Sequence, residues 1–549
     1  MSLGRVGALL AVWVSGAAGA TAQQPPDTSG PRIRHYGFYI ALPDSGSEIR
    51  GIATISISFP ARRIDTLRLD LVGMHVDSVT EALSGQTLPF GYDGTVLRIL
   101  LPAAPPGVAL PLGAPWDVHV VWHGKPRDGL IVQPSARGRW SAFGDDWPQR
   151  ARDWLPTVDD PARKAPVSWI VSAPADLQVV ANGALQQRAG SGGRMAWIYQ
   201  EYHPIPTYTM VIGATRMTVS RHRPAILRAD TIPIEVWAYP EDSAFADSVP
   251  FRRVTEIVET LQRLIGPFPY ERLGHVESST RYGGMENASA IFYDERMYVT
   301  RRMGEGVVRH ETAHQWFGDA VTERDFHHLW LSEGFATFYD LVVGAALDGD
   351  SVYTRGIEAA AREVERSGVV NRPILDTTVT DLTQLLDANS YQKGALVLHM
   401  LREYVGRTAF FLGIRDYYRT YRDSSVLSDD FARVMERASG KKLDWFFDQW
   451  LRQPGYPRLD VAWRYDAAAG TAVLDVAQVQ PAAWGTFRLP NLTLDFMDGT
   501  RLVARRVVDV SAARQTLRVD VPAAPGEVRV DPDGALLVTA TVRKASRSR

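Results

Sequence analysis

The sequence predicts a multidomain α+β protein, with a β region at each end and a mostly helical region between them. Three observations support this expectation. At 549 residues the chain is too long for a single hydrophobic core. Apolar residues alternate with polar ones at both ends of the chain, as in half-buried strands. In the middle they follow the i, i+3, i+4 spacing of amphipathic helices.

The β pattern extends from about residue 33 to about residue 220. Its clearest alternating segments are 49–59, 65–73, 115–124 and 166–174. Proline- and glycine-rich stretches such as 102–115 separate these segments and are typical of turns. We therefore expect an antiparallel β domain at residues 23–222.

Helical spacing begins near residue 245 and is replaced by strand-like alternation after residue 457. The best helical segments are 248–266, 355–368 and 391–406. We expect a mostly helical domain at 223–453 and a β-sandwich-like domain at 454–541. The last residues, 542–549, are basic and are expected to form a frayed tail.

Composition excludes several classes of function. The net charge of −2 gives no basic surface for nucleic acid, so no nucleic-acid partner is expected. The chain contains no cysteine, which excludes disulfides, thiolate ligands and cysteine nucleophiles. Histidine, aspartate and glutamate are then the only strong ligands available for a transition metal.

Residues 1–22 have the pattern of a secretory signal peptide. Arg5 supplies the positive charge, residues 8–14 form a short apolar core, and small residues allow cleavage after Ala20 or Ala22. The apolar run is too short to cross about 30 Å of hydrocarbon. We expect an exported protein, periplasmic or secreted, with no integral membrane span after signal removal.

The segment His310-Glu311-Thr312-Ala313-His314 fits the pattern H-E-x-x-H. Residues four apart lie one above the other on a helix, so both imidazoles can face one metal ion. Glu311 would then lie beside a metal-activated water without being a ligand. Gly318 is expected to end this helix, with Trp316 and Phe317 buried in its last turn.

A site with two histidines needs a third protein ligand and leaves a fourth position open. Glu333 is the best candidate, with Ser332 before it as a possible helix cap. His327 and His328 are the alternatives, although surface or loop-packing roles suit them better. Two further acids, Asp319 and Asp340, could accept a histidine N–H and fix its tautomer; solvated surface positions are the other interpretation of both.

These residues, taken with four other motifs, resemble the zinc aminopeptidases of the aminopeptidase N and leukotriene hydrolase family (gluzincins). The family signature is H-E-x-x-H, eighteen residues, then Glu, all present between His310 and Glu333. "GGMEN" (Gly283, Gly284, Met285, Glu286, Asn287) resembles its G-x-M-E-N exopeptidase motif. Segments 390–398, 154–167 and 447–457 also match family blocks, so the resemblance covers roughly residues 140–460.

The resemblance implies a thermolysin-like catalytic domain at 223–453 and one Zn²⁺ per chain, held by His310, His314 and Glu333. It implies Glu311 as general base and Tyr391 as a hydrogen-bond donor to the transition state. The five residues of GGMEN would bind the substrate, with Glu286 pairing with its free ammonium. The implied activity is removal of the N-terminal residue from peptides.

The chain also departs from the family pattern. Asp319 and Ser332 stand where the family usually has asparagine, and the large helical C-terminal domain of longer members is replaced by β-type sequence. Three alternatives stay open at this point: an endopeptidase of the thermolysin kind, a non-catalytic relative that binds peptides, and an epoxide-hydrolase side activity, which no motif here supports or excludes. Side-chain preference and oligomeric state are not determined by these motifs.

Overall fold

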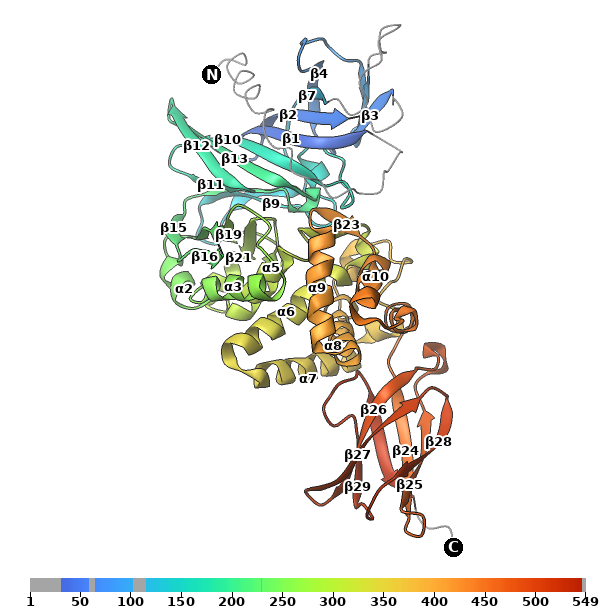
Figure 1. Ribbon diagram of the computed structural model, residues 1–549. Coiled ribbons are helices and arrows are strands. Elements are labelled where there is room, and N and C mark those ends of the chain that lie inside the picture. Colours follow the sequence, from blue (N-terminus) through green and yellow to red (C-terminus); the bar gives the residue numbers. More distant parts are fainter. Residues whose placement is uncertain (1–30, 59–64, 102–114, 229, 546–549) are drawn as a thin grey trace. The chain divides into compact units, whose positions relative to one another are not determined.

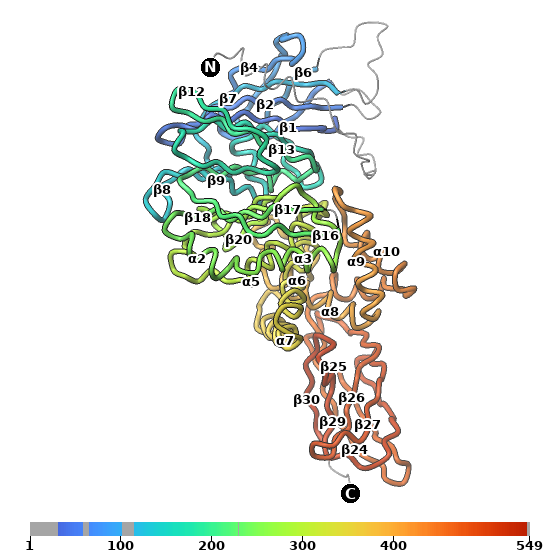
Figure 2. Tube along the Cα trace, turned by 60° about the vertical axis from the view of Figure 1, so that its left-hand side comes forward, coloured from blue at the N-terminus to red at the C-terminus, as the bar shows by residue number. Residues whose placement is uncertain are grey.

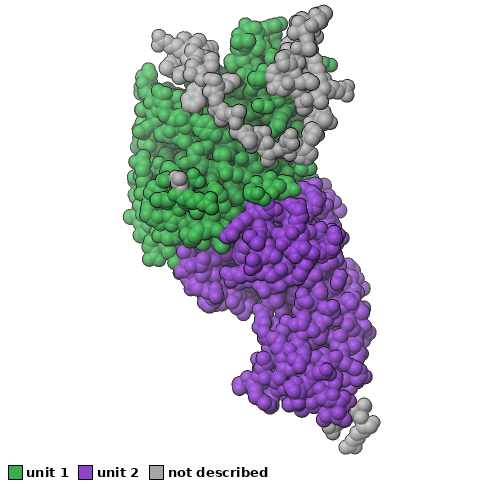
Figure 3. Space-filling view, in the orientation of Figure 1, with its two compact units in different colours: residues 1–325, 418–426 green, residues 326–417, 427–549 purple. Residues whose placement is uncertain are grey.

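The computed structural model describes residues 31–58, 65–101, 115–228 and 230–545. The predicted signal peptide at 1–22 lies outside these residues. Two compact units are present: unit 1 comprises residues up to 325 together with 418–426, and unit 2 comprises 326–417 and 427–549 (Figure 3). Among the described helices, none is both long and apolar enough to cross a membrane.

The N-terminal part of unit 1 is almost entirely β (Figure 1). Its strands are β1 (Arg32–Ala41), β2 (Ile49–Ser58), β3 (Thr66–Asp70), β4 (His75–Glu81), β5 (Phe90–Tyr92), β6 (Val96–Leu100), β7 (Trp116–Gly124), β8 (Gly129–Pro134), β9 (Trp140–Asp145), β10 (Ala165–Pro174), β11 (Gln178–Ala181), β12 (Ala184–Ser191), β13 (Arg194–Ile205) and β14 (Ile212–Thr215). The largest sheet has the order β12-β13-β10-β1-β2-β7-β4, which leaves β4 at an edge (Figure 2).

The expectation of a β domain is confirmed, with one difference in topology. Every ladder of the large sheet is antiparallel except β1 with β10, which pair in parallel. The alternation read from the sequence is visible in β7, where Val118, Val120 and Trp122 are buried while their neighbours are half-exposed. Trp122 and Trp169 are among the largest fully buried side chains of this core.

The rest of unit 1 surrounds a second sheet of order β15-β18-β19-β21-β20. Its elements are β15 (Thr218–Arg221), β16 (Ala225–Leu227), β17 (Asp230–Ile232), β18 (Ile234–Ala238), α2 (Ser243–Ser248), α3 (Val254–Leu264), β19 (Leu273–Ser278), β20 (Gly284–Met285), β21 (Ala290–Asp294), α4 (Glu295–Val299), α5 (Glu305–His314), β22 (Val321–Glu323) and β23 (Ser424–Val426). Strand β20 lies at the sheet edge, antiparallel to β21.

Unit 2 begins with the helices α6 (Trp330–Asp348), α7 (Asp350–Arg366), α8 (Gly394–Val405), α9 (Arg407–Tyr421), α10 (Ser428–Ser439) and α11 (Asp444–Phe447). Residues 418–421 of α9 are counted with unit 1. Helix α8 continues a π-helical turn, Asn389–Lys393. Residues 394–401 of α8 are all buried, so this part of the helix is enclosed on every side, whereas 402–405 are partly exposed.

The C-terminal strands form two sheets, of order β28-β25-β24-β30 and β27-β26-β29. Their bounds are β24 (Arg458–Asp466), β25 (Thr471–Gln478), β26 (Leu489–Asp498), β27 (Arg501–Val510), β28 (Arg514–Asp520), β29 (Glu527–Val530) and β30 (Thr539–Lys544). These sheets confirm the expected C-terminal β domain, and no large helical domain follows it in the described chain. Residues 542–544, expected to be part of a basic tail, instead pair with β24, and residues 546–549 lie outside the described chain.

Two hydrogen bonds connect the C-terminal β domain to α8. His399 Nε2 donates to the Gly534 carbonyl at 2.8 Å, and the Leu537 amide donates to Met400 Sδ at 3.3 Å. Both acceptor and donor segments lie between β29 and β30. The loop before the last strand therefore covers one side of the enclosed helix.

Candidate active site

Helix α5 carries the H-E-x-x-H residues, as predicted. It begins at Glu305 and ends at His314, before Gly318. Gly318 has φ +122° and its amide donates to the Val321 carbonyl, so it forms the turn into β22 and is not the helix cap. Trp316 and Phe317 are fully buried, as expected.

The two imidazoles of α5 converge through their Nε2 atoms, which lie 3.1 Å apart. His314 Nδ1 lies 3.1 Å from the Phe317 carbonyl, which can only accept, so the proton is on Nδ1 and Nε2 carries the lone pair. Two histidine nitrogens on one tetrahedral zinc, each at about 2.0–2.1 Å, would be roughly 3.3 Å apart. The pair therefore fits a zinc ion.

Two carboxylates lie beside these imidazoles. Ligand atoms of Glu286, Glu311 and His314 are all within 4.8 Å of one another. Glu311 and Glu286 are each only 7% exposed, so both charges are held largely away from water. The group combines a candidate metal ligand, a candidate base and a candidate ammonium partner.

A glycine is required where β20 passes Glu311. A Cβ added to Gly284 would lie 2.1 Å from Glu311 Oε1, far inside contact distance. At the neighbouring Gly283 the nearest atom to such a Cβ is Met297 Sδ, at 3.6 Å. Of the two glycines in GGMEN, only Gly284 is forced by the packing of the site.

Gln315, the residue after His314, ties the GGMEN loop to α5. Its Nε2 donates to the Glu286 carbonyl at 2.6 Å, and its Oε1 accepts from the Ser289 amide at 2.8 Å. Gln315 is fully buried. The loop position that carries Glu286 is thus set by a side chain on the metal-ligand segment.

The same Gln315 Nε2 donates to Asp319 Oδ2 at 2.8 Å. Burial raises the pKa of Asp319 well above its usual range, and the charge of Glu286 raises it further. Asp319 does not orient His314 in the way we expected, because the Phe317 carbonyl, within the turn that follows the helix, takes the Nδ1 proton instead. Asp319 instead accepts a hydrogen bond from Gln315, the residue that follows His314.

Two side chains outside the helical region support the same segments. Asn182 Nδ2 donates to the Ala288 carbonyl at 2.7 Å. Lys164 Nζ donates to the carbonyls of Asp319 and Ala320 at 2.6 and 2.9 Å, and burial lowers its pKa to about 8. Sequence reasoning missed Gln315, Asn182 and Lys164, since a buried polar residue that bonds to distant backbone has no periodic signature.

The other predicted site residues lie in unit 2. Glu333 is on α6 and 6% exposed, Asp340 is half-buried on the same helix, and Tyr391 is half-buried in the π-helical turn. Ser332 is not a cap, because α6 already begins at Trp330. A Cβ on Gly334 would lie 2.9 Å from the Gly394 backbone, so α6 touches the start of α8 directly.

His327 and His328 form part of a short 3₁₀ turn, Phe326–His328. His327 Nε2 donates to the Val379 carbonyl at 2.9 Å, and His328 Nδ1 lies 2.7 Å from Ser428 Oγ. These contacts agree with the expected loop-packing role of His327 and His328.

The helical region matches a known family. A model described as "Peptidase family M1 domain" matches residues 252–450. "Probable aminopeptidase 2" of Sulfurisphaera tokodaii is 32% identical over 324 residues, which are 56% of this chain and 40% of that protein. "Probable aminopeptidase 1" of Saccharolobus solfataricus is 27% identical over 464 residues, 78% of this chain and 54% of that protein. The chain thus spans about half the length of these curated relatives.

Solved structures give the same assignment. The M1 zinc metallopeptidase from Deinococcus radiodurans is similar with a TM-score of 0.67 and 25% identity, covering 78% of this chain and 95% of that one. Legionella pneumophila aminopeptidase A is similar in fold, with a TM-score of 0.78 and 17% identity over 95% of this chain and 60% of that one. Residues 252–450 of the chain therefore match the peptidase family M1 domain, and the fold resembles that of M1 zinc metallopeptidases.

Proposed function

We propose that the chain is a zinc-dependent aminopeptidase that removes the N-terminal residue from peptides with a free N-terminus. The observation that carries this proposal is the group formed by His310, His314, Glu311 and Glu286 in unit 1. The names of the relatives, aminopeptidases and zinc metallopeptidases, support it.

In this proposal His310, His314 and Glu333 hold one zinc ion per chain. The spacing of Glu333 in the family signature and its burial on α6 support its part. When bound, zinc supplies Lewis acidity, which makes water nucleophilic near neutral pH and polarises the scissile carbonyl. The donor set of two imidazoles and one carboxylate leaves room for a substrate oxygen.

Glu311 is the general base in the proposed reaction. It takes the proton of the attacking water and delivers it to the leaving amine, so that one carboxylate serves both steps. Its carboxylate is held against the backbone of β20 at Gly284, which limits its movement. The Tyr391 hydroxyl donates to the oxyanion that develops on the carbonyl.

Glu286 makes the enzyme an exopeptidase by pairing with the substrate ammonium. Two unit charges about 4 Å apart interact by roughly 4 kcal/mol at an effective dielectric constant near 20, before desolvation is counted. Half of that value corresponds to about a thirtyfold preference for a free amine, at about 1.4 kcal/mol per factor of ten. Strand β20 lies at the sheet edge, where an extended peptide can lie beside it.

The test is a panel of aminoacyl arylamides and their N-acetylated forms, with and without a metal chelator. Free-amine substrates should be cleaved, acetylated ones at least thirtyfold more slowly, and chelator should abolish both activities. Glu286→Gln should lower kcat/KM for the free-amine substrates alone. Equal cleavage of acetylated substrates, or cleavage inside a blocked peptide, would instead establish an endopeptidase.

A second variant tests whether the chain is a catalyst or only binds peptides. Glu311→Gln should keep its zinc, measured by elemental analysis, and lose several orders of magnitude in kcat. A wild-type protein that binds zinc but turns over no substrate in the panel would be a non-catalytic relative. Retained turnover in Glu311→Gln would show that another group is the base.

We also propose that the protein is exported, on the strength of the signal pattern in residues 1–22. N-terminal sequencing of the protein recovered from periplasm or medium should begin after Ala20 or Ala22. A protein recovered only from the cytoplasm with its Met1 end intact would contradict this.

A further inference from the structure

A second group of metal-ligating side chains lies in the N-terminal part of unit 1, on the edge strand β4 and its neighbour β7. His75 and His123 are directly opposite each other in the antiparallel ladder. The register then passes from Val76–Trp122 to Ser78–Val121, so that Asp77 has no partner on β7. This β-bulge leaves the Asp77 side chain free to turn towards the two imidazoles.

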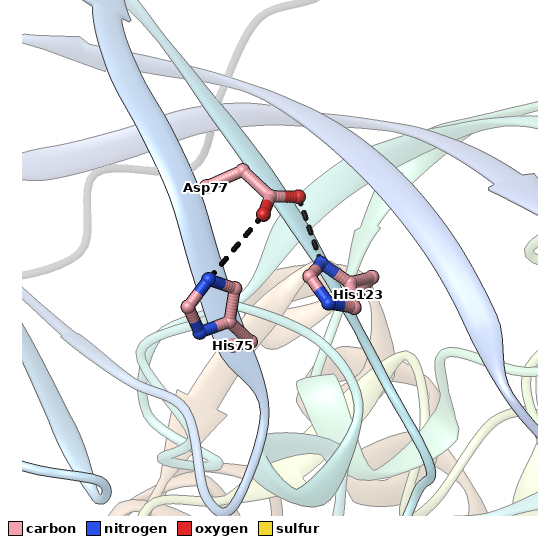
Figure 4. Close-up of side chains that lie close together, drawn as sticks. All are labelled: His75, Asp77 and His123. Atoms are coloured by element: carbon pink, nitrogen blue, oxygen red, sulfur yellow. Dashed lines mark hydrogen bonds and ion pairs between the residues drawn. The ribbon is translucent and has the colours of Figure 1, made fainter.

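Figure 4 shows the Asp77 carboxylate between the two rings, one oxygen facing each. Asp77 Oδ2 is 2.9 Å from His123 Nδ1, and Oδ1 is 3.5 Å from His75 Nε2. The ring centroids are 4.8 Å apart, and the three ligand atoms lie within 4.8 Å of one another. Ligands of one tetrahedral zinc are roughly 3.3 Å apart, so small side-chain rotations bring all three to one ion.

An ordinary surface ion pair is the competing explanation, and it accounts for only part of the arrangement. One carboxylate can pair with one imidazole at the surface, for a gain of about 0–1 kcal/mol. A second histidine facing the same carboxylate from the opposite strand adds a like charge whenever both rings are protonated. Two neutral imidazoles and one carboxylate converging on a point are instead the donor set of a transition-metal ion.

We propose that His75, Asp77 and His123 bind a divalent transition metal such as Zn²⁺, independently of the site on α5. The imidazole donors favour Zn²⁺, Co²⁺, Ni²⁺ or Cu²⁺ over Mg²⁺ and Ca²⁺, which prefer oxygen. All three side chains are at least 32% exposed, so water completes the coordination. No catalytic role follows from this geometry.

The ion would cross-link an edge strand to the body of its sheet. β4 pairs with β7 on one side only, and this chain has no cysteine with which to fasten it. A ligand that binds only the folded state adds about 2.7 kcal/mol of stability at a concentration one hundred times its Kd. The expected effect of metal is therefore on the stability of the N-terminal β domain.

Zinc titration of the full chain, followed by calorimetry and by elemental analysis after desalting, tests the proposal. Wild type should bind a second equivalent beyond the one on α5, with a Kd at or below about 10 μM, or −6.8 kcal/mol. His75→Ala and His123→Ala should each weaken that second equivalent at least tenfold. Cleavage of aminoacyl arylamides should be unchanged in both variants.

His119→Ala is the matched control. His119 lies on the same strand and the same half-exposed face as His123, but the ladder places it opposite Thr80. It should keep the second equivalent. Zinc content that is the same in the wild type and in the His75→Ala, His123→Ala double variant would overturn the proposal, whether or not the site on α5 is filled.

Discussion

Gln315→Leu tests whether the loop that carries Glu286 is positioned from α5. The change keeps the side-chain size and removes three hydrogen bonds: to the Glu286 carbonyl, to Asp319 Oδ2 and from the Ser289 amide. All three partners are buried, and leaving a buried polar group unpaired costs about 1–3 kcal/mol. The loop is expected to shift to recover part of this energy.

In the proposed function, this shift moves Glu286 away from the substrate ammonium and so weakens their interaction. Losing about 1.4–2.8 kcal/mol of this interaction lowers kcat/KM for a free-amine arylamide roughly 10- to 100-fold. The slow cleavage of the N-acetylated substrate should hardly change, because Glu286 has no ammonium to bind there. The two rate constants are measured side by side, with zinc content and thermal unfolding on the same preparations.

Gln262→Leu is the control, because it makes the same chemical change at another buried position. Gln262 lies on α3, is 2% exposed, and neither of its polar side-chain atoms has a hydrogen-bond partner in the described chain. This variant should be as active and at least as stable as wild type. If Gln315→Leu lowers cleavage of both substrates by the same factor, the residue acts on folding and the positioning argument fails.

Three further variants address two features of unit 1. Gly284→Ala should lower kcat at least tenfold because the added Cβ would collide with Glu311 Oε1, whereas Gly283→Ala should hardly change kcat. Steady-state kinetics on one arylamide compares the two variants. Equal effects would contradict the packing argument. Burial, with the nearby Asp242 charge, raises the pKa of Glu277 from 4.5 to about 9. Between these pH values the folded protein keeps a proton on Glu277 that the unfolded chain releases. The free energy of unfolding therefore falls as pH rises towards 9. Glu277→Gln should remove a slope of up to about 1.4 kcal/mol per pH unit between those values, measured by urea unfolding, and identical slopes in both proteins would refute it.

The parts of the fold that depend on local pattern could be predicted from the sequence. The alternation in 49–59 and 115–124 and the helical spacing in 248–266 contain β2, β7 and α3, although α3 begins only at Val254. The parallel pairing of β1 with β10 could not be predicted, since it joins strands more than a hundred residues apart. The last three residues of β30, 542–544, were assigned to a tail because the side chains of this strand are mostly exposed and it is held by backbone hydrogen bonds to β24.

The candidate site divides in the same way. His310, Glu311 and His314 follow from helical spacing alone, and the structure brings their expected neighbour Glu286 to them. What sequence could not supply is the set of contacts that hold that neighbour, because Gln315 reaches Glu286 across 29 residues. Asp319 was assigned to the wrong partner for a related reason. The hydrogen bond from His314 Nδ1 goes to the backbone carbonyl of Phe317, and a backbone acceptor cannot be recognised from residue types.

The enclosure of α8 makes the C-terminal β domain part of the solvent barrier of the helical region. If the chain were cut before β24, the loop that bonds to His399 and Met400 would leave, and apolar residues such as Leu396 would face water. That helix directly continues the turn that carries Tyr391. A shortened chain without residues 458–544 should therefore aggregate, so the C-terminal β domain is needed to keep the helical region in solution.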